Sequence, residues 1–269
     1  MSFRAIAVDW SGRKTGERSA ICLAEASAGK LTRVESGFTR EEVIRHLIEL
    51  KDDDPNLVVG FDFSFSLPGW FVTEQGCKSA VDFWQVVASQ GEEWLAECSD
   101  PFWGKPGCKK PSQDPGRPQL RVTDIATAAA AGQMPRSPFQ VSGAGSVGSS
   151  TLRGIPFLLD LKEAGFGIWP WDDATPPAAV EIWTRVAIGN TVKSSPKERI
   201  AAVQAHKGIP KRLVLDASAS EDLFDAAMSA LWLSENGLNL RASKRSRRQA
   251  DLLEGRTWMP SAPSPNRNA

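Results

Sequence analysis

Residues 3–12 read Phe-Arg-Ala-Ile-Ala-Val-Asp-Trp-Ser-Gly, an apolar run that ends at the carboxylate of Asp9 and is followed by a Ser-Gly turn. Such a run predicts a buried strand that the turn stops. Residues 57–62, Leu-Val-Val-Gly-Phe-Asp, are nearly continuous apolar sequence that again ends in an aspartate, Asp62. This pattern is typical of a central strand covered on both faces. We therefore expect two central strands, each with a carboxylate at its C-terminal end.

The sequence between these two runs predicts how they are joined. Residues 19–24 and 31–38 are strand-like, and their short connections favour an antiparallel meander. Thr39 stands three residues before Glu42 in a capping-box pattern, which predicts a helix that ends near residues 52–55. Because a crossover helix returns the chain parallel to the first strand, the ends that carry Asp9 and Asp62 can lie side by side.

The remaining sequence predicts an insertion and a second set of elements. Residues 68–150 form the insertion, with a helical patch at 78–97 and a Pro/Gly-rich stretch at 101–118. Its many aromatic residues are expected to form a small satellite core. The alternative is a lid that stacks on a ligand and contacts phosphate through nearby basic residues, namely Lys105, Lys109, Lys110 and Arg117.

Beyond the insertion, residues 151–163 predict a helix, and residues 166–171 and 179–188 predict strands. Ser218 precedes Glu221 by three residues, a second capping-box pattern before a buried helix. We expect one α/β domain over residues 1–260, with a mixed five-stranded sheet and helices on both faces, and a disordered tail at 261–269.

Five acids are the strongest candidates for chemistry, and they are Asp9, Asp62, Glu181, Asp222 and Asp225. Asp222 and Asp225 are three apart on the predicted helix and can share a face. Buried carboxylates are costly unless cations neutralise them, and the hard ions Mg²⁺ and Mn²⁺ bind oxygen ligands. One or two such ions can activate water for phosphodiester hydrolysis. Each acid alone also has a structural explanation: a turn at a strand end, a helix N-terminus, or a Glu181–Arg185 pair on one strand.

Several motifs together resemble the DUF429 family of predicted ribonuclease-H-like nucleases. The similarity spans about residues 4–260 and is carried by residues 7–12, 60–68, 143–148, 169–170, 181–185, 222–226 and 254–258. It implies a ribonuclease-H-like fold and a metal-dependent nuclease. The Asp-x-x-Asp-Ala at 222–226 is also similar to that of Holliday-junction resolvases. The chain departs from the family pattern at Ser64, where Pro is usual, and at Trp183 and Thr184, where Tyr-Pro is frequent.

Candidate substrate contacts lie beside these acids and in a basic run. Ser11, Ser64 and Arg185 neighbour the acids, while Lys244 and Arg245 belong to residues 241–248, the densest positive run. Such a run can contact nucleic-acid phosphates, although a solvated helix face is the alternative. A nucleic acid or a nucleotide is therefore the expected partner.

Composition excludes several other classes. The 32 basic and 32 acidic residues balance, so the chain has no global positive field, and any binding to a nucleic acid or membrane must come from a local patch. No run approaches a membrane helix and the first residues lack a signal-peptide core, which predicts a cytoplasmic protein. The four cysteines form no CxxC pair and both histidines are distant from them, which argues against zinc. Residues 143–148 match GxGxxG but lack a leading strand, so we expect a loop that begins the next helix and approaches an anion.

Two other functions remain open at this level. Actin-like phosphotransferases also use an aspartate at the end of their first strand. They need a second such domain, however, and this chain is short for two. A non-catalytic module on the same fold could instead bind a ligand or partner through the aromatic insertion. The fold by itself does not decide among these functions.

Overall fold

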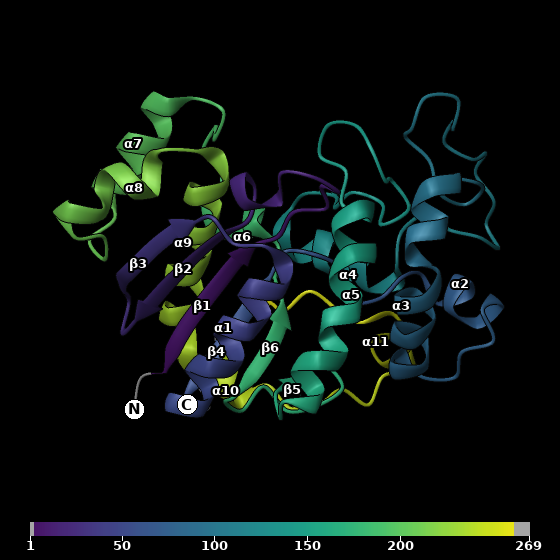
Figure 1. The fold of residues 1–269 in the computed structure, drawn as a ribbon, viewed down its shortest axis with the longest axis horizontal. Coiled ribbons are helices and arrows are strands. Elements are labelled where there is room, and N and C mark those ends of the chain that lie inside the picture. The colour runs from purple at the N-terminus through teal and green to yellow at the C-terminus, as the bar shows by residue number, and fades with distance from the viewer. Residues whose placement is uncertain (1–2, 261–269) are drawn as a thin grey trace, which may run out of the picture.

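The computed structural model describes residues 3–260, which contain one six-stranded mixed sheet with the order β3-β2-β1-β4-β6-β5 (Figure 1). The strands are Arg4–Asp9 (β1), Cys22–Ser27 (β2), Lys30–Ser36 (β3), Leu57–Phe61 (β4), Gly167–Ile168 (β5) and Ala178–Glu181 (β6). The α/β class is confirmed. The expected sheet of five strands is wrong by one, because the segment predicted as a strand at 166–171 joins the edge of the sheet as β5, which is only two residues long.

The strand directions bring three acids to one edge of the sheet. β2 runs antiparallel to β1 and β3, whereas β1, β4 and β6 are parallel neighbours. Val8 is opposite Phe61, and Phe61 is opposite Glu181. Asp9, Asp62 and Glu181 therefore lie at the same C-terminal edge on three adjacent strands, as the crossover rule predicts for the first two.

Helices cover both faces of the sheet. The α-helices in the described range are Arg40–Asp53 (α1), Gly69–Glu74 (α2), Ala80–Glu97 (α3), Val122–Ala131 (α4), Gly148–Glu163 (α5), Thr184–Ile188 (α6), Pro196–Ala205 (α7), Val214–Ser218 (α8), Glu221–Glu235 (α9), Gly237–Ala242 (α10) and Gln249–Glu254 (α11). Short 3₁₀ turns occupy Glu17–Ser19 and Lys211–Leu213. On one face, Ile6 and Val8 pack in a core with α1, α3 and α5, while Ala5 and Ala7 on the other face pack in a core with α9. Figure 1 shows α2 and α3 at the end of the molecule opposite α7 and α8.

One of the two predicted capping boxes is confirmed. The Thr39 hydroxyl accepts a hydrogen bond from the Glu42 amide, and the Glu42 carboxylate accepts one from the Thr39 amide, so the first capping box is present. The second capping box, predicted at Ser218, is wrong. Ser220 caps α9 by accepting from the Leu223 amide at 3.0 Å, whereas Ser218 belongs to the preceding helix α8.

Three predicted strands differ most from the structure in their bounds. Residues 19–24 begin as a 3₁₀ turn, so β2 starts only at Cys22. Residues 166–171 give only the short β5, because the Asp172 carboxylate accepts a hydrogen bond from the Ile168 amide at 2.9 Å and turns the chain. Residues 179–188 are strand only as far as Glu181, after which the chain forms α6. The apolar residues after Glu181 fit the period of a strand and that of a helix equally, and the tertiary packing favours the helix.

The aromatic residues of the 68–150 region do not form a separate satellite core. Phe71, Phe83, Phe102 and Phe139 are buried in the same cluster as the sheet residue Val8. Their rings contact one another at 5.4–6.2 Å between centroids, mostly edge to face. The region thus widens one face of the main core. The predicted disordered tail, 261–269, lies outside the described residues, and within residues 3–260 no helix has the length and apolar character to cross a membrane.

A candidate carboxylate site at the edge of the sheet

Asp9 and Asp62 form the centre of the candidate site. Their carboxyl groups contact each other through a side-chain hydrogen bond, and the Trp10 amide donates to Asp62 Oδ1 at 2.7 Å. Burial, the neighbouring Asp62 and then Asp225 raise the pKa of Asp9 well above its ordinary value. Burial likewise raises the pKa of Asp62 to about 6, although the hydrogen bonds from Asp9 and Trp10 oppose the shift. Two carboxyl groups in contact require a proton or a cation between them.

Asp225 lies beside these two acids and is paired with a lysine. It lies on α9 and is buried, and its Oδ2 forms an ion pair with Lys193 Nζ. Burial raises the pKa of Asp225, and Lys193 opposes that shift. The negative field extends to Cys22, opposite Asp9 in the sheet, where burial and then the nearby aspartates raise the thiol pKa to about 12.

Glu181, at the end of the neighbouring strand β6, is fully paired. Arg121 Nη2 and Nη1 donate to its two oxygens at 2.5 and 2.8 Å, the Thr257 hydroxyl donates at 2.7 Å and the Phe65 amide at 2.9 Å. Arg121 also donates to Asp124 Oδ1 at 2.7 Å, and all three charged side chains are almost inaccessible to solvent. Glu181 thus binds a guanidinium here, and Arg185, its expected structural partner, donates instead to the Gly189 carbonyl at 3.3 Å.

Asp222 faces a second space. A cavity of about 520 Å³ is lined by Asp9, Asp62, Glu181 and Asp225, and we call it the carboxylate cavity. Asp222 lines a neighbouring cavity of about 360 Å³, together with Asp9 and the turn after β1. Asp9 therefore borders both cavities, with Asp225 on the first and Asp222 on the second.

The GxGxxG segment forms the wall between the two cavities. Ser146 and Ser150 line both, and α5 begins at Gly148, so the segment is a loop that opens a helix, as expected. Gly12 packs against this helix start, where a Cβ on Gly12 would lie 2.3 Å from the Ser150 amide nitrogen. Only glycine allows this approach between the β1 turn and α5.

The candidate substrate contacts divide into two groups. Ser64 and Arg185 line the carboxylate cavity, and Ser11 lines the neighbouring one. Lys244 and Arg245 line neither. Lys244 Nζ pairs with Asp173 at 3.0 Å, and the Arg245 amide donates to Asp173 at 2.9 Å, so these two residues contact the segment after β5.

The carboxylate oxygens are of the kind that binds a divalent cation, but the side chains are not arranged as a metal site. Within residues 3–260, no three His, Cys, Asp or Glu side chains form a ready-made metal site. The side chains account for this, because Lys193 holds Asp225, Arg121 holds Glu181, and Asp222 faces the other cavity. Asp9 and Asp62 nonetheless supply the hard oxygen donors that Mg²⁺ and Mn²⁺ prefer, and a cation could take the place of the shared proton.

Sequence reasoning missed the cations of the site. Lys193 lies in a loop before α7, and Arg121 lies just before α4, inside the presumed insertion. The spacing of Arg121 and Asp124, three residues apart at a helix start, was the only local signal for their pair. Nothing near Lys193 in the sequence indicates Asp225.

Comparisons of the chain with models of known protein families, with curated protein sequences and with solved structures give no match.

Proposed function

We propose that this chain is a metal-dependent phosphodiester hydrolase of ribonuclease-H-like type that acts on a nucleic acid or nucleotide. The contact between Asp9 and Asp62 at the ends of adjacent parallel strands is the observation that carries the proposal. The antiparallel meander of β1, β2 and β3, followed by helix α1 and the parallel strand β4, is the order that the sequence predicts, and it supports the fold assignment.

The charges favour a site for one divalent ion. If ionised, Asp9, Asp62 and Asp225 with Lys193 leave two negative charges in a partly enclosed cavity, which one Mg²⁺ or Mn²⁺ would neutralise. A bound ion would lower the pKa of a water and stabilise the leaving oxygen. We assign Asp9 and Asp62 to holding the ion, with Asp225 beside them.

The other side chains of the cavity have supporting roles in this proposal. Lys193 offsets the charge of Asp225 and supplies an ammonium group toward an incoming phosphate. Arg121 fixes Glu181, whose oxygen also accepts from the Phe65 amide and so holds the segment after Asp62 in place. A rigid segment at this point keeps the Asp62 carboxylate oriented.

Cleavage of labelled nucleic acids tests the proposal. Single-stranded, duplex and branched DNA and RNA are incubated with Mn²⁺ and wild type, Asp62→Asn or Asp216→Asn. Asp216 is an exposed aspartate on α8, so its variant is a matched control. Cleavage by wild type and the control, with loss on chelation and in Asp62→Asn, is expected. Silence of all three proteins on every substrate would reject the hydrolase, and a thermal-shift response to ATP would then favour the phosphotransferase.

A further inference from the structure

A second cavity adjoins the carboxylate cavity on the side of the 68–150 region. It has a volume of about 580 Å³ and is walled by Trp103, Pro111, Ile125 and the basic residues Lys110 and Arg136. We call it the tryptophan cavity. Pro135 and Arg136 line both this cavity and the carboxylate cavity, so the two spaces meet at the 135–136 segment.

The ring of Trp103 is fixed in place. Its Nε1 donates to Gln119 Oε1 at 2.9 Å, and the Ser137 hydroxyl donates to the Gln119 carbonyl at 2.7 Å. The Trp103 backbone bonds to Phe139 and Val141 at 3.0 and 2.9 Å. An aromatic wall held on both its ring and its backbone is prearranged for a flat ligand, which lowers the entropy lost on binding.

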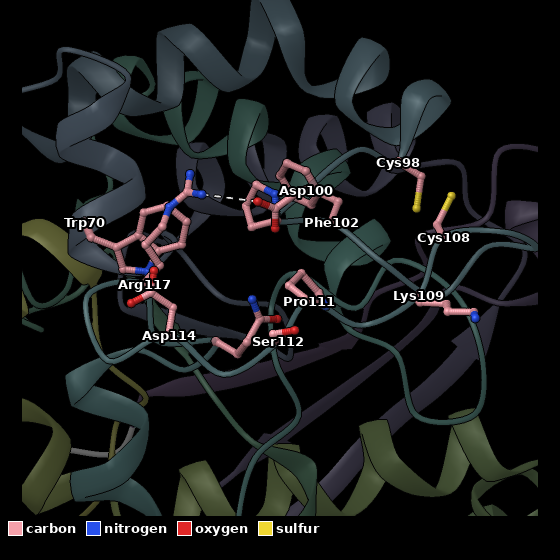
Figure 2. Close-up of a pocket in the computed structure, with 12 residues that line it drawn as sticks. Trp70, Cys98, Asp100, Phe102, Cys108, Lys109, Pro111, Ser112, Asp114 and Arg117 are labelled. Carbon is pink, nitrogen blue, oxygen red and sulfur yellow. Dashed lines mark hydrogen bonds and ion pairs between the residues drawn. The ribbon is translucent and has the colours of Figure 1, made fainter.

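Several residues of the 111–117 segment also line the tryptophan cavity, and Arg117 anchors this segment to α2 and to Asp100. Arg117 stacks over Trp70 at 4.5 Å and pairs with Glu74 at 2.9 Å and Asp100 at 3.2 Å. Trp70, Asp100 and Arg117 line a separate cavity of about 460 Å³. Figure 2 shows this cavity, where Cys98 and Cys108 direct their sulfur atoms toward each other. Because Pro111 and Arg117 border both cavities, this anchoring also shapes the tryptophan cavity.

The charge of the tryptophan cavity is positive. Lys110 Nζ lies over the Trp103 ring at 5.6 Å, and Arg136 is exposed and has no ion pair with any residue in 3–260. The acid on this wall is Asp114, whose Oδ1 already accepts from the Gly116 amide at 2.8 Å. Cations beside an aromatic face are the combination that binds the backbone and bases of an unpaired strand.

The adjacent helix exposes apolar side chains. α4 buries polar residues, Thr123, Asp124 and Thr127, and leaves Val122 and Ile125 more than half exposed. Ile125, 55% exposed, lies on the wall of the tryptophan cavity. Apolar groups exposed beside a cavity are typical of a site that a ligand covers.

We infer that the tryptophan cavity is a subsite for an unpaired nucleobase of a single-stranded nucleic acid, with Arg136 on the phosphate that leads to the carboxylate cavity. This inference rests on the proposed function and names its substrate as single-stranded. A base inside a duplex is stacked and paired, so it cannot enter the cavity without being unstacked. A base that stacks on Trp103 displaces the flexible Lys110 ammonium, which remains available to a phosphate.

Binding without cleavage tests the subsite. Fluorescein-labelled eight-residue dT and rU oligonucleotides are titrated with the full chain in EDTA, and fluorescence anisotropy gives Kd. Trp103→Ala should weaken binding by about fivefold to a hundredfold, the usual loss for one base stacked on an aromatic ring. An oligonucleotide with abasic positions should bind more weakly to wild type and be insensitive to Trp103→Ala.

A second pair of variants covers the case in which Trp103→Ala disturbs folding. Ile125→Asp places a negative charge on the cavity wall and should weaken binding, whereas Leu215→Asp, at a 77% exposed position on α8, should bind like wild type. Equal Kd values for normal and abasic strands, tighter binding of duplex, or equal effects of the two aspartate variants would overturn the subsite. Base-dependent binding without any cleavage would keep the subsite and reject the hydrolase, while cleavage without base dependence would do the reverse.

Discussion

Arg121 and Glu181, sixty residues apart in the sequence, form a buried two-point ion pair, with nitrogen–oxygen distances of 2.5 and 2.8 Å. Arg121 reaches β6 from the start of α4 and also holds Asp124. Desolvating three charges is costly, and the hydrogen bonds among them offset that cost only while all three are present. This pair therefore joins the 68–150 region to the edge of the sheet where the candidate site lies.

Removal of Arg121 should destabilise the protein strongly. Arg121→Met leaves Glu181 and Asp124 buried without their counter-charge, so the free energy of unfolding should fall by about 3–5 kcal/mol. Lys244→Met, which breaks an exposed pair with Asp173, should cost less than about 1 kcal/mol. Urea denaturation measures both, and similar losses for the two variants would contradict the assigned role of Arg121.

Glu181→Gln and Asp62→Asn should have opposite effects. Glu181 is engaged by Arg121, so its variant should lose about 2–4 kcal/mol of stability and keep most of its Mn²⁺ affinity. Asp62→Asn should lose Mn²⁺ binding without that loss of stability. Calorimetric titration with Mn²⁺ and urea denaturation separate the two effects. Loss of Mn²⁺ binding in a folded Glu181→Gln protein would instead make Glu181 a metal ligand.

The pH dependence of stability should report the Asp9–Asp62 contact. The folded pKa of Asp62 is raised from 3.8 to about 6, so its contribution is present below pH 3.8 and is lost as pH rises through 6. In EDTA, the Tm of wild type should therefore fall relative to that of Asp62→Asn between about pH 4 and 6. Relative to its value below pH 3.8, the stability of wild type at pH 8 should be lower by about 3 kcal/mol, a loss that the variant does not share.

Asp216→Asn is the control for this measurement, because it makes the same chemical change at an exposed position. Its Tm should follow that of wild type across the whole range. A constant difference between wild type and Asp62→Asn from pH 4 to 8 would show that the carboxyl contact does not control the titration.

Lys193→Met should make the protein more dependent on metal. Without the ammonium group, Asp225 is buried with no cation beside it, and the metal-free protein should lose about 1–3 kcal/mol. Mn²⁺ should then raise the Tm by more than it does for wild type, since the uncompensated charge is greater. The double variant Lys193→Met/Asp225→Asn should return the Mn²⁺ response toward that of wild type. A response unaffected by either change would place the ion away from Asp225.

The parts of the fold that were predictable depend on local signals or general connection rules. The helix start at Thr39 follows from its capping-box pattern, and the meeting of Asp9 with Asp62 follows from the parallel return of a crossover connection. The strand predicted after Glu181 is wrong, because the apolar spacing of these residues fits both a strand and a helix. Ser220 replaced Ser218 as the cap because an additional short helix, α8, precedes α9.

The acids of the candidate site could be predicted from the sequence, but the basic side chains that pair with them could not. An aspartate at the end of an apolar strand is visible in one segment of sequence. The pairs of Lys193 with Asp225 and of Arg121 with Glu181 depend on where loops fold back over the sheet, and no periodicity encodes that. The ion pairs thus decide which acids remain open to a ligand, and only the structure gives them.

The tight approach of Gly12 to the start of α5 has a consequence for motion. The turn after β1 packs directly against Ser149 and Ser150 at the start of α5, so opening either segment removes packing from the other. The backbone amides of residues 10–12 and 148–151 should therefore exchange hydrogen with solvent as one cooperative unit. Both walls of the space around Asp9 would then loosen together, at a common opening rate.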